Sequence, residues 1–127
     1  MQFGFVPRRL LGNADEPDYG RPFSQWIADL EKGIKTAEGA GFEFMGNSGM
    51  QSINLFARYA AIPTKLRFAN ETLTLPMLDP VQLAPAAAHV DQMLEGRLDF
   101  GVGIGYYPSD LAAAGITRKD RVPKFVE

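Results

Sequence analysis

Four apolar, strand-like segments alternate with helical segments along nearly the whole chain, and this order restricts the fold more than any other feature. The apolar segments lie at residues 1–6, 42–46, 65–76 and 97–105. Strands that alternate with helices form a parallel sheet covered by helices, so the order predicts an α/β fold. The segments are continuous apolar runs, as expected for parallel strands. An open doubly wound sheet and part of a (β/α)8 barrel both satisfy this pattern.

The helical segments carry their own signals. The helix predicted at 25–41 has one apolar face, spaced at i, i+3, i+7 and i+10, formed by Ile27, Leu30, Ile34 and Ala37. Ser24 is its predicted N-cap. Asp79 and Pro80 predict the start of the third helix, because Asp is a favourable cap and Pro suits the first helical position. Pro85 follows inside that helix, so we expect a kink or a late helix start.

Length and composition limit the functional classes. The 127 residues are the size of one domain, and we assign residues 1–127 to it. The net charge is −2 and no basic block occurs, which argues against nucleic acid and anionic membranes as partners. Cysteine is absent, so neither a disulfide nor a thiolate metal site is possible, and no metal is expected. We expect His89 to lie on the surface. No signal peptide or membrane-length apolar run is visible, which predicts a cytoplasmic protein.

Both candidate architectures bind ligands at the carboxyl ends of their parallel strands. This rule selects four short segments, at Pro7 to Arg9, Gly46 to Gly49, Asn70 to Thr74 and Gly103 to Asp110. No Ser-His-Asp set, phosphate-binding loop or metal cluster accompanies them. The residues by themselves therefore predict a small-molecule site and do not name its chemistry.

The fourth apolar segment contains three alternating glycines, Gly101, Gly103 and Gly105. Alternate strand residues share a face, so the three glycines leave one face bare. They do not form a dinucleotide-binding fingerprint, because Tyr106 and Tyr107 follow where a helix should start. Glycine in a strand marks either tight packing against a neighbour or the close approach of a ligand. Both interpretations remain open at this point.

Two acidic residues near the strand ends also allow two interpretations. Glu71 interrupts an apolar strand, where a buried carboxylate needs a partner, so it either faces a ligand or pairs with Arg67 or Lys65. Asp110 follows the fourth strand, where it either belongs to the site or caps the next helix.

The sequence resembles the luciferase-like flavin monooxygenase family. The resemblance rests on a strand that ends in "LP", on "DPVQLA", and on "VDQMLEGRLDFGVGIGYY" followed by an acidic residue, "GI" and an arginine. The opening "MQFGFV" and the segment "AEGAGFEFM" fit the same family. The resemblance implies a (β/α)8 barrel that binds reduced flavin at the carboxyl ends of its strands.

The resemblance also implies roles for individual residues. Flavin-binding positions correspond to Asn70, Glu71, Thr72, Gly103, Gly105 and Tyr106. Asp110 matches an acidic residue near the flavin and is a predicted catalytic residue. Many members have a histidine after the second strand, where this chain has Asn47 and Ser48, and we assign Asn47 as the second catalytic candidate. A cis peptide bond, found beneath the flavin ring in such enzymes, is expected between Glu71 and Thr72.

The implied activity is a flavin-dependent monooxygenase or oxidoreductase. Reduced FMN, supplied by a partner reductase, would act with O2 on a small organic substrate. Hydride transfer with the deazaflavin F420 is the alternative cofactor chemistry.

The chain is shorter than a whole barrel, which needs ~250 residues. The fold expected here is therefore a TIM-barrel-type half barrel of about the first four β/α units. Such a half barrel has two open strand edges, which predicts a homo-oligomer if the chain is stable alone. A non-catalytic fragment is the other possibility.

Overall fold

The computed structural model describes residues 2–5, 22–47 and 52–126. The predicted candidates at Pro7 to Arg9 and at Ser48 lie outside the described residues. In chain order the elements are β1 (Gly4–Phe5), α1 (Phe23–Gly39), β2 (Phe44–Asn47), α2 (Ser52–Tyr59), β3 (Arg67–Thr74), the 3-10 helix η1 (Leu75–Met77), α3 (Pro80–Met93), β4 (Leu98–Gly103), α4 (Pro108–Ala113) and α5 (Arg121–Val126). The predicted alternation of strands and helices is confirmed.

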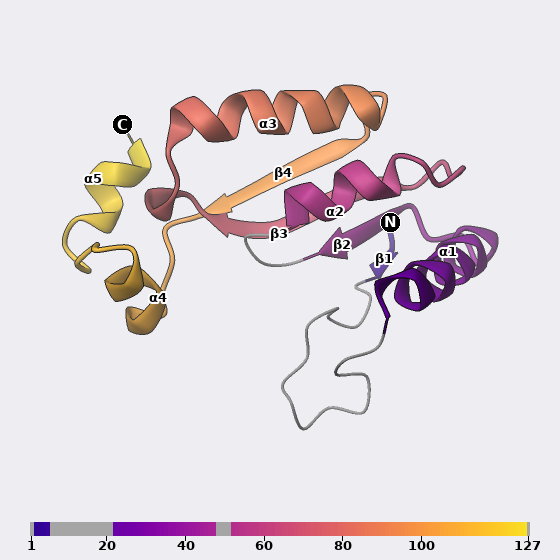
Figure 1. The fold of residues 1–127 in the computed structure, drawn as a ribbon, viewed down its shortest axis with the longest axis horizontal. Helices are drawn as coiled ribbons and strands as arrows, with labels where there is room; N and C mark the ends of the chain where they lie inside the picture. The colour runs from indigo at the N-terminus through magenta and orange to yellow at the C-terminus, as the bar shows by residue number, and fades with distance from the viewer. Residues whose placement is uncertain (1, 6–21, 48–51, 127) are drawn as a thin grey trace.

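The four strands form one parallel sheet in the order β1-β2-β3-β4. Crossovers between parallel strands are right-handed, so a sheet whose strands follow chain order carries its helices on one face. Figure 1 shows α1, α2 and α3 alongside the sheet, with α4 and α5 beyond the arrowheads of β3 and β4. The predicted α/β class with a parallel sheet is therefore confirmed.

The main core lies between the sheet and these helices. All four residues of the predicted α1 face are buried, which confirms that helical pattern. An aromatic group joins α2 to β3, with ring centroids of Phe56, Tyr59 and Phe68 5.8–5.9 Å apart. The sheet side of this core includes Met45, Phe68 and Leu73, all at most 1% exposed. Burying such large apolar side chains contributes about 1.5–3 kcal/mol each.

The helix starts confirm one sequence prediction, correct a second and decide between the two outcomes expected at Pro85 only in excluding a late helix start. The Asp79 carboxylate accepts a hydrogen bond of 2.9 Å from the Val81 N–H, and Pro80 opens α3, as predicted. Helix α1 begins at Phe23 with Pro22 as its N-cap, so Ser24 is the second helical residue and the predicted cap was wrong. Pro85 lies inside α3 and does not delay its start. It occupies the sixth helical position, where only one backbone hydrogen bond is forgone.

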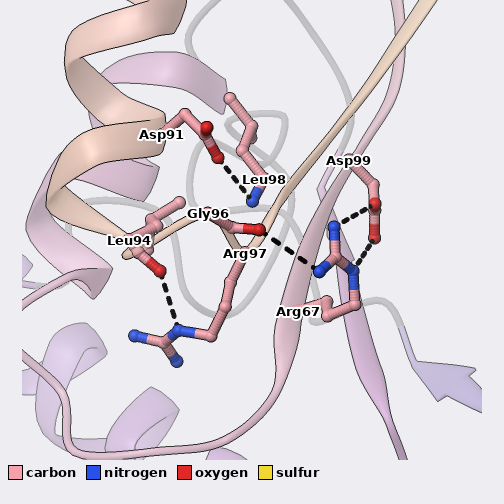
Figure 2. A network of polar contacts seen from close by, with 7 residues as sticks. All are labelled: Arg67, Asp91, Leu94, Gly96, Arg97, Leu98 and Asp99. Atoms are coloured by element: carbon pink, nitrogen blue, oxygen red, sulfur yellow. Dashed lines mark hydrogen bonds and ion pairs between the residues drawn. The ribbon is translucent and has the colours of Figure 1, made fainter.

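Polar contacts tie the amino-terminal end of β4 to the start of β3 and to the end of α3, as Figure 2 shows. Arg67 donates to both carboxylate oxygens of Asp99, at 2.9 and 2.6 Å. The Asp91 carboxylate accepts the Leu98 N–H at 3.1 Å, and Arg97 donates to the Leu94 carbonyl at 2.8 Å. In (β/α) folds this end of the strands serves stability, and the opposite end carries the site.

Candidate functional site

The carboxyl ends of β2, β3 and β4 lie side by side at one edge of the sheet. Asn47 pairs with Asn70, and Thr74 pairs with Gly103. Residues that alternate with the core-facing Met45, Phe68 and Leu98 point to the other side of the sheet, which we call the open face. The open face carries Phe44, Gly46, Arg67, Ala69, Glu71, Asp99, Gly101 and Gly103. A hollow of about 300 Å³ on this face touches Phe44, Arg67, Ala69 and Asp99.

The three glycines of the fourth strand segment differ in what their missing side chains would meet. A Cβ atom on Gly101 would lie 2.3 Å from the Asn70 carbonyl oxygen, so packing requires glycine there. Gly105 lies beyond the end of β4 with φ of 74°, and its Cβ would lie 2.5 Å from Thr74 Cγ2. Gly103 is different, because its Cβ would meet only Thr72, at 3.6 Å. Internal packing therefore explains Gly101 and Gly105 and leaves Gly103 available for a ligand.

A β-bulge interrupts β3 at Glu71 and Thr72. The pairing passes from Asn70–Phe100 to Leu73–Val102, so two residues of β3 face the single Gly101. Thr72 has φ of 74°, a genuine outlier for a β-branched residue. The expected cis peptide bond at this point was wrong, since all peptide bonds of the described residues are trans. The irregularity that the chain does have at this position is a bulge with a left-handed residue, and bulges are over-represented beside active sites.

Glu71 extends across β2 on the open face. Its Oε1 atom lies only 2.2 Å from where a Cβ atom of Gly46 would be, so the side chain occupies the space that Gly46 leaves. The residue is exposed, and the sequence-based assumption that it is buried was wrong. Arg67 pairs with Asp99, and among the described residues no ion pair joins Glu71 to Arg67 or Lys65, so that alternative was also wrong. Among the described residues Glu71 has no ion-pair partner, which leaves its carboxylate available to a ligand.

The two asparagines occupy the side of the sheet that faces the helices. Asn70 is 3% exposed, accepts a hydrogen bond from the Ser52 hydroxyl and donates one of 2.7 Å to the Gly101 carbonyl. This buried amide therefore joins α2 to β4 and has little remaining capacity for a ligand. Asn47 alternates with Gly46 and so shares the side of Met45, where it is half-buried. The assignment of Asn47 as a catalytic residue stays a prediction.

The turn after β4 presents aromatic rings to solvent. Tyr106 is 72% exposed, and its ring centroid lies 4.1 Å from that of Tyr107. The hydrogen bond with Tyr107 raises the pKa of the Tyr106 phenol, and the nearby Asp110 charge adds to this effect. Asp110 lies in the first turn of α4, whose N-cap is Tyr107 without a side-chain cap bond, so the capping interpretation was wrong. The exposed Asp110 carboxylate remains a candidate.

Two residues that sequence reasoning missed hold this region in place. Ser52 is fully buried at the start of α2 and binds Asn70. Arg121 of α5 donates a hydrogen bond of 2.8 Å to the Gly105 carbonyl, which lies sixteen residues earlier in the chain. Neither contact has a local sequence signal, because each depends on how distant segments meet.

The described residues fit a flat cofactor in part. Glu71, Gly103 and Tyr106 offer, respectively, a hydrogen-bond acceptor, an unfilled strand position and an exposed ring at one edge of the sheet. Asn70 lies on the helix-facing side of the sheet, where its hydrogen bonds hold α2 and β4 together. In the described parts of the chain no group of three metal-ligating side chains occurs, and no helix is long and apolar enough to span a membrane.

The luciferase-like monooxygenase family matches residues 10–127, and the chain belongs to this family. An uncharacterized protein of Mycobacterium tuberculosis is 30% identical over 89 residues, covering 67% of this chain and 31% of that protein. The 4-hydroxyprotoasukamycin monooxygenase of Streptomyces nodosus is 35% identical over 72 residues, covering 56% of this chain and 19% of the relative. The chain thus spans less than a third of the curated relatives it matches.

Solved structures share the fold. Monooxygenase RslO1 from Streptomyces bottropensis aligns with a TM-score of 0.82 at 20% sequence identity. The alignment covers 99% of this chain and 40% of the RslO1 chain. A second structure is the oxygenating constituent of 3,6-diketocamphane monooxygenase from Pseudomonas putida, a type II Baeyer-Villiger enzyme in complex with FMN. Its TM-score is 0.74 at 24% sequence identity, and the alignment covers 99% of this chain and 37% of that chain. The coenzyme F420-dependent tetrahydromethanopterin reductase of Methanopyrus kandleri aligns with a TM-score of 0.63 at 21% sequence identity. The alignment covers 92% of this chain and 30% of that chain.

Proposed function

We propose that this chain forms the flavin-binding half of a monooxygenase or oxidoreductase that uses reduced FMN and O2 on a small organic substrate. Membership of the luciferase-like monooxygenase family over residues 10–127 is the observation that carries the proposal. A similar solved structure is a complex with FMN, which supports that cofactor.

Bound reduced flavin would supply the electrons that activate O2. The chain's own contribution is to bind and orient the ring. Gly103 leaves room at the end of β4, because only Thr72 approaches its missing side chain. Among the described residues the Glu71 carboxylate has no ion-pair partner, so it can accept a ring N–H, and the exposed Tyr106 ring can lie against a flat ligand. Asp110, whose exposed carboxylate lies near Tyr106, would be the residue that exchanges a proton with the bound substrate.

Hydride transfer with F420 is the second candidate. It is favoured by the similarity to an F420-dependent reductase and by Asn47, which stands where many family members have a histidine. The resemblance assigns that histidine to oxygen chemistry, which hydride transfer does not need. Affinity for the two cofactors separates the candidates.

The third candidate is a half barrel without catalytic activity. We propose that residues 1–127 are one domain made of about the first four β/α units of a barrel. In the described sheet β1 and β4 are the edge strands, and exposed edges favour association. We therefore expect two or more copies to associate at micromolar concentration in a preparation of this chain. The partner reductase and the cytoplasmic location also stay predictions.

The test is a titration of FMN and F420, each oxidised and reduced, into the 127-residue chain, with light scattering in parallel. Circular dichroism first establishes that the preparation is folded. Micromolar binding of reduced FMN above F420 supports the first candidate, and the reverse order supports the second. A folded chain that binds neither cofactor up to millimolar concentration contradicts both and leaves the non-catalytic half barrel.

A further inference from the structure

A buried polar pair lies directly behind the bulge of β3, on the side of the sheet that faces the helices. Ser52, the first residue of α2, is fully buried, and Asn70 of β3 is 3% exposed. In the part of the chain that the structure describes, all other buried side chains are apolar or aromatic. Polar groups that are fully hydrogen-bonded inside a core rigidify the structure around them. The pair therefore has a local structural effect that can be traced.

The hydrogen bonds of this pair fix the direction of the Asn70 amide. A backbone carbonyl can only accept a hydrogen bond, so the Asn70 Nδ2 atom faces the Gly101 carbonyl oxygen, at 2.7 Å. The amide oxygen of Asn70 then faces Ser52, whose hydroxyl donates to it. The Ser52 hydroxyl is the donor that this orientation requires, and an apolar side chain in its place would leave the buried amide oxygen without that bond.

The inward position of Asn70 explains why β3 has a bulge. Side chains alternate along a strand, so after Phe68 and Asn70 the next residue on the helix-facing side would be Thr72. Leu73 is buried there instead, at 1% exposure, which leaves Glu71 and Thr72 between two buried anchors. The extra residue forms the bulge, and Thr72 takes φ of 74°. A backbone outlier persists only where its surroundings determine it, so the two anchors hold the bulge.

We propose that the hydrogen bond between Ser52 and Asn70 holds the bulge in place and thereby directs the Glu71 carboxylate across the open face. Burial of its apolar side chain fixes Leu73, whereas hydrogen bonds to α2 and β4 fix Asn70. Glu71 follows Asn70 directly, and its side chain occupies the space that Gly46 leaves. Ser52 is therefore a positioning residue, because it acts on Glu71 through Asn70. The importance of Glu71 for a ligand rests on the function proposed above.

The first test follows the bulge itself by NMR of the full chain and needs no ligand. Ser52→Ala should shift or double the backbone amide signals of Glu71, Thr72 and Gly101, and should change the coupling constant that reports φ of Thr72. Tyr59→Phe is the matched control. It also removes one hydroxyl from a fully buried residue of α2, and within the described residues that hydroxyl has no hydrogen-bond partner. It should leave the three amide signals in place.

Two further measurements separate positioning from a general loss of stability. Ile53→Val shortens the buried side chain next to Ser52, so it should lower the urea midpoint of unfolding without moving the bulge signals. In the unaltered chain, one side-chain amide proton of Asn70 should exchange slowly with solvent, which tests the pair even if Ser52→Ala does not fold. Rapid exchange of both protons, unchanged bulge signals in folded Ser52→Ala, or equal shifts in Ile53→Val would each overturn the proposal.

A second test connects the bulge to flavin binding. Ser52→Ala should weaken the binding of reduced FMN about tenfold, as expected for one lost hydrogen bond to the Glu71 carboxylate, and Tyr59→Phe should leave the affinity unchanged. If the unaltered chain binds no FMN, the proposed function fails, and the NMR comparison alone then supports or overturns the positioning of the bulge. If FMN binds equally well to a Ser52→Ala variant whose bulge signals have moved, the role of this pair in the site is overturned.

Discussion

The glycines of β4 allow a sharp comparison, because two of them point to the same face and only one is required by packing. A Cβ atom on Gly101 would lie 2.3 Å from the Asn70 carbonyl oxygen, whereas one on Gly103 would lie 3.6 Å from Thr72 Cβ. Ordinary contact begins at 3.4 Å, so Gly101→Ala must displace a backbone atom of the neighbouring strand by about 1 Å. Gly103→Ala displaces nothing.

The two substitutions should therefore change the free energy of unfolding in different directions. Overpacking costs about 1–3 kcal/mol, and replacing glycine by alanine restores about 0.4–1 kcal/mol through the unfolded chain. Gly101→Ala should lower the free energy of unfolding by about 1–2 kcal/mol, and Gly103→Ala should leave it unchanged or raise it slightly. Urea unfolding of both variants measures the difference. If Gly103→Ala were the more damaging change, the packing argument would be refuted.

The same pair separates stability from binding. If the open position at Gly103 accepts the flavin ring, Gly103→Ala should keep the fold and weaken FMN binding at least tenfold, a loss of about 1.4 kcal/mol. Unchanged FMN affinity in the stable Gly103→Ala variant would show that the ring lies elsewhere.

Three further changes test other parts of the structure. Thr72→Gly should raise the free energy of unfolding by about 1 kcal/mol, because a left-handed backbone with φ of 74° is strained for threonine and not for glycine. A fall in the urea midpoint of unfolding would contradict this. Tyr59→Phe should be neutral or stabilising by about 1 kcal/mol in thermal unfolding, since within the described residues the buried Tyr59 hydroxyl has no hydrogen-bond partner. Glu38 accepts hydrogen bonds from the Lys65 N–H and the Thr64 hydroxyl, and these lower its pKa from 4.5. This contribution to the free energy of unfolding is present above pH 4.5 and is lost as the pH falls through the lower folded-state pKa. Glu38→Gln should therefore flatten the acid side of a plot of unfolding free energy against pH. An unchanged plot would refute the assignment.

Much of the fold could be predicted because its signals are local and repeated. The apolar spacing of Ile27, Leu30 and Ile34 identifies the buried face of α1, and Asp79 followed by Pro80 identifies the start of α3. The parallel sheet follows from the order of the segments. The start of α1 was misplaced because Ser24 resembles a cap, whereas Pro22 has the extended backbone and accepts the first hydrogen bonds.

The candidate site was less predictable because it depends on contacts between strands. The alternating glycines indicate a bare face, yet only the structure shows that the Asn70 carbonyl fills the space beside Gly101. Glu71 reads as a buried charge in an apolar segment, but the bulge at Thr72 leaves it exposed on the open face. Backbone irregularity of this kind has no sequence period, so pattern analysis cannot place it.

The most direct test of the central claim is to locate bound FMN on the folded chain. Backbone amide NMR signals are followed while reduced FMN is added without oxygen. We expect the largest shifts at Glu71, Gly103 and Tyr106, and little change at Asp99 near the opposite end of the strands. Shifts centred on Asp99, or none at millimolar FMN, would contradict a flavin site at the carboxyl ends of the strands.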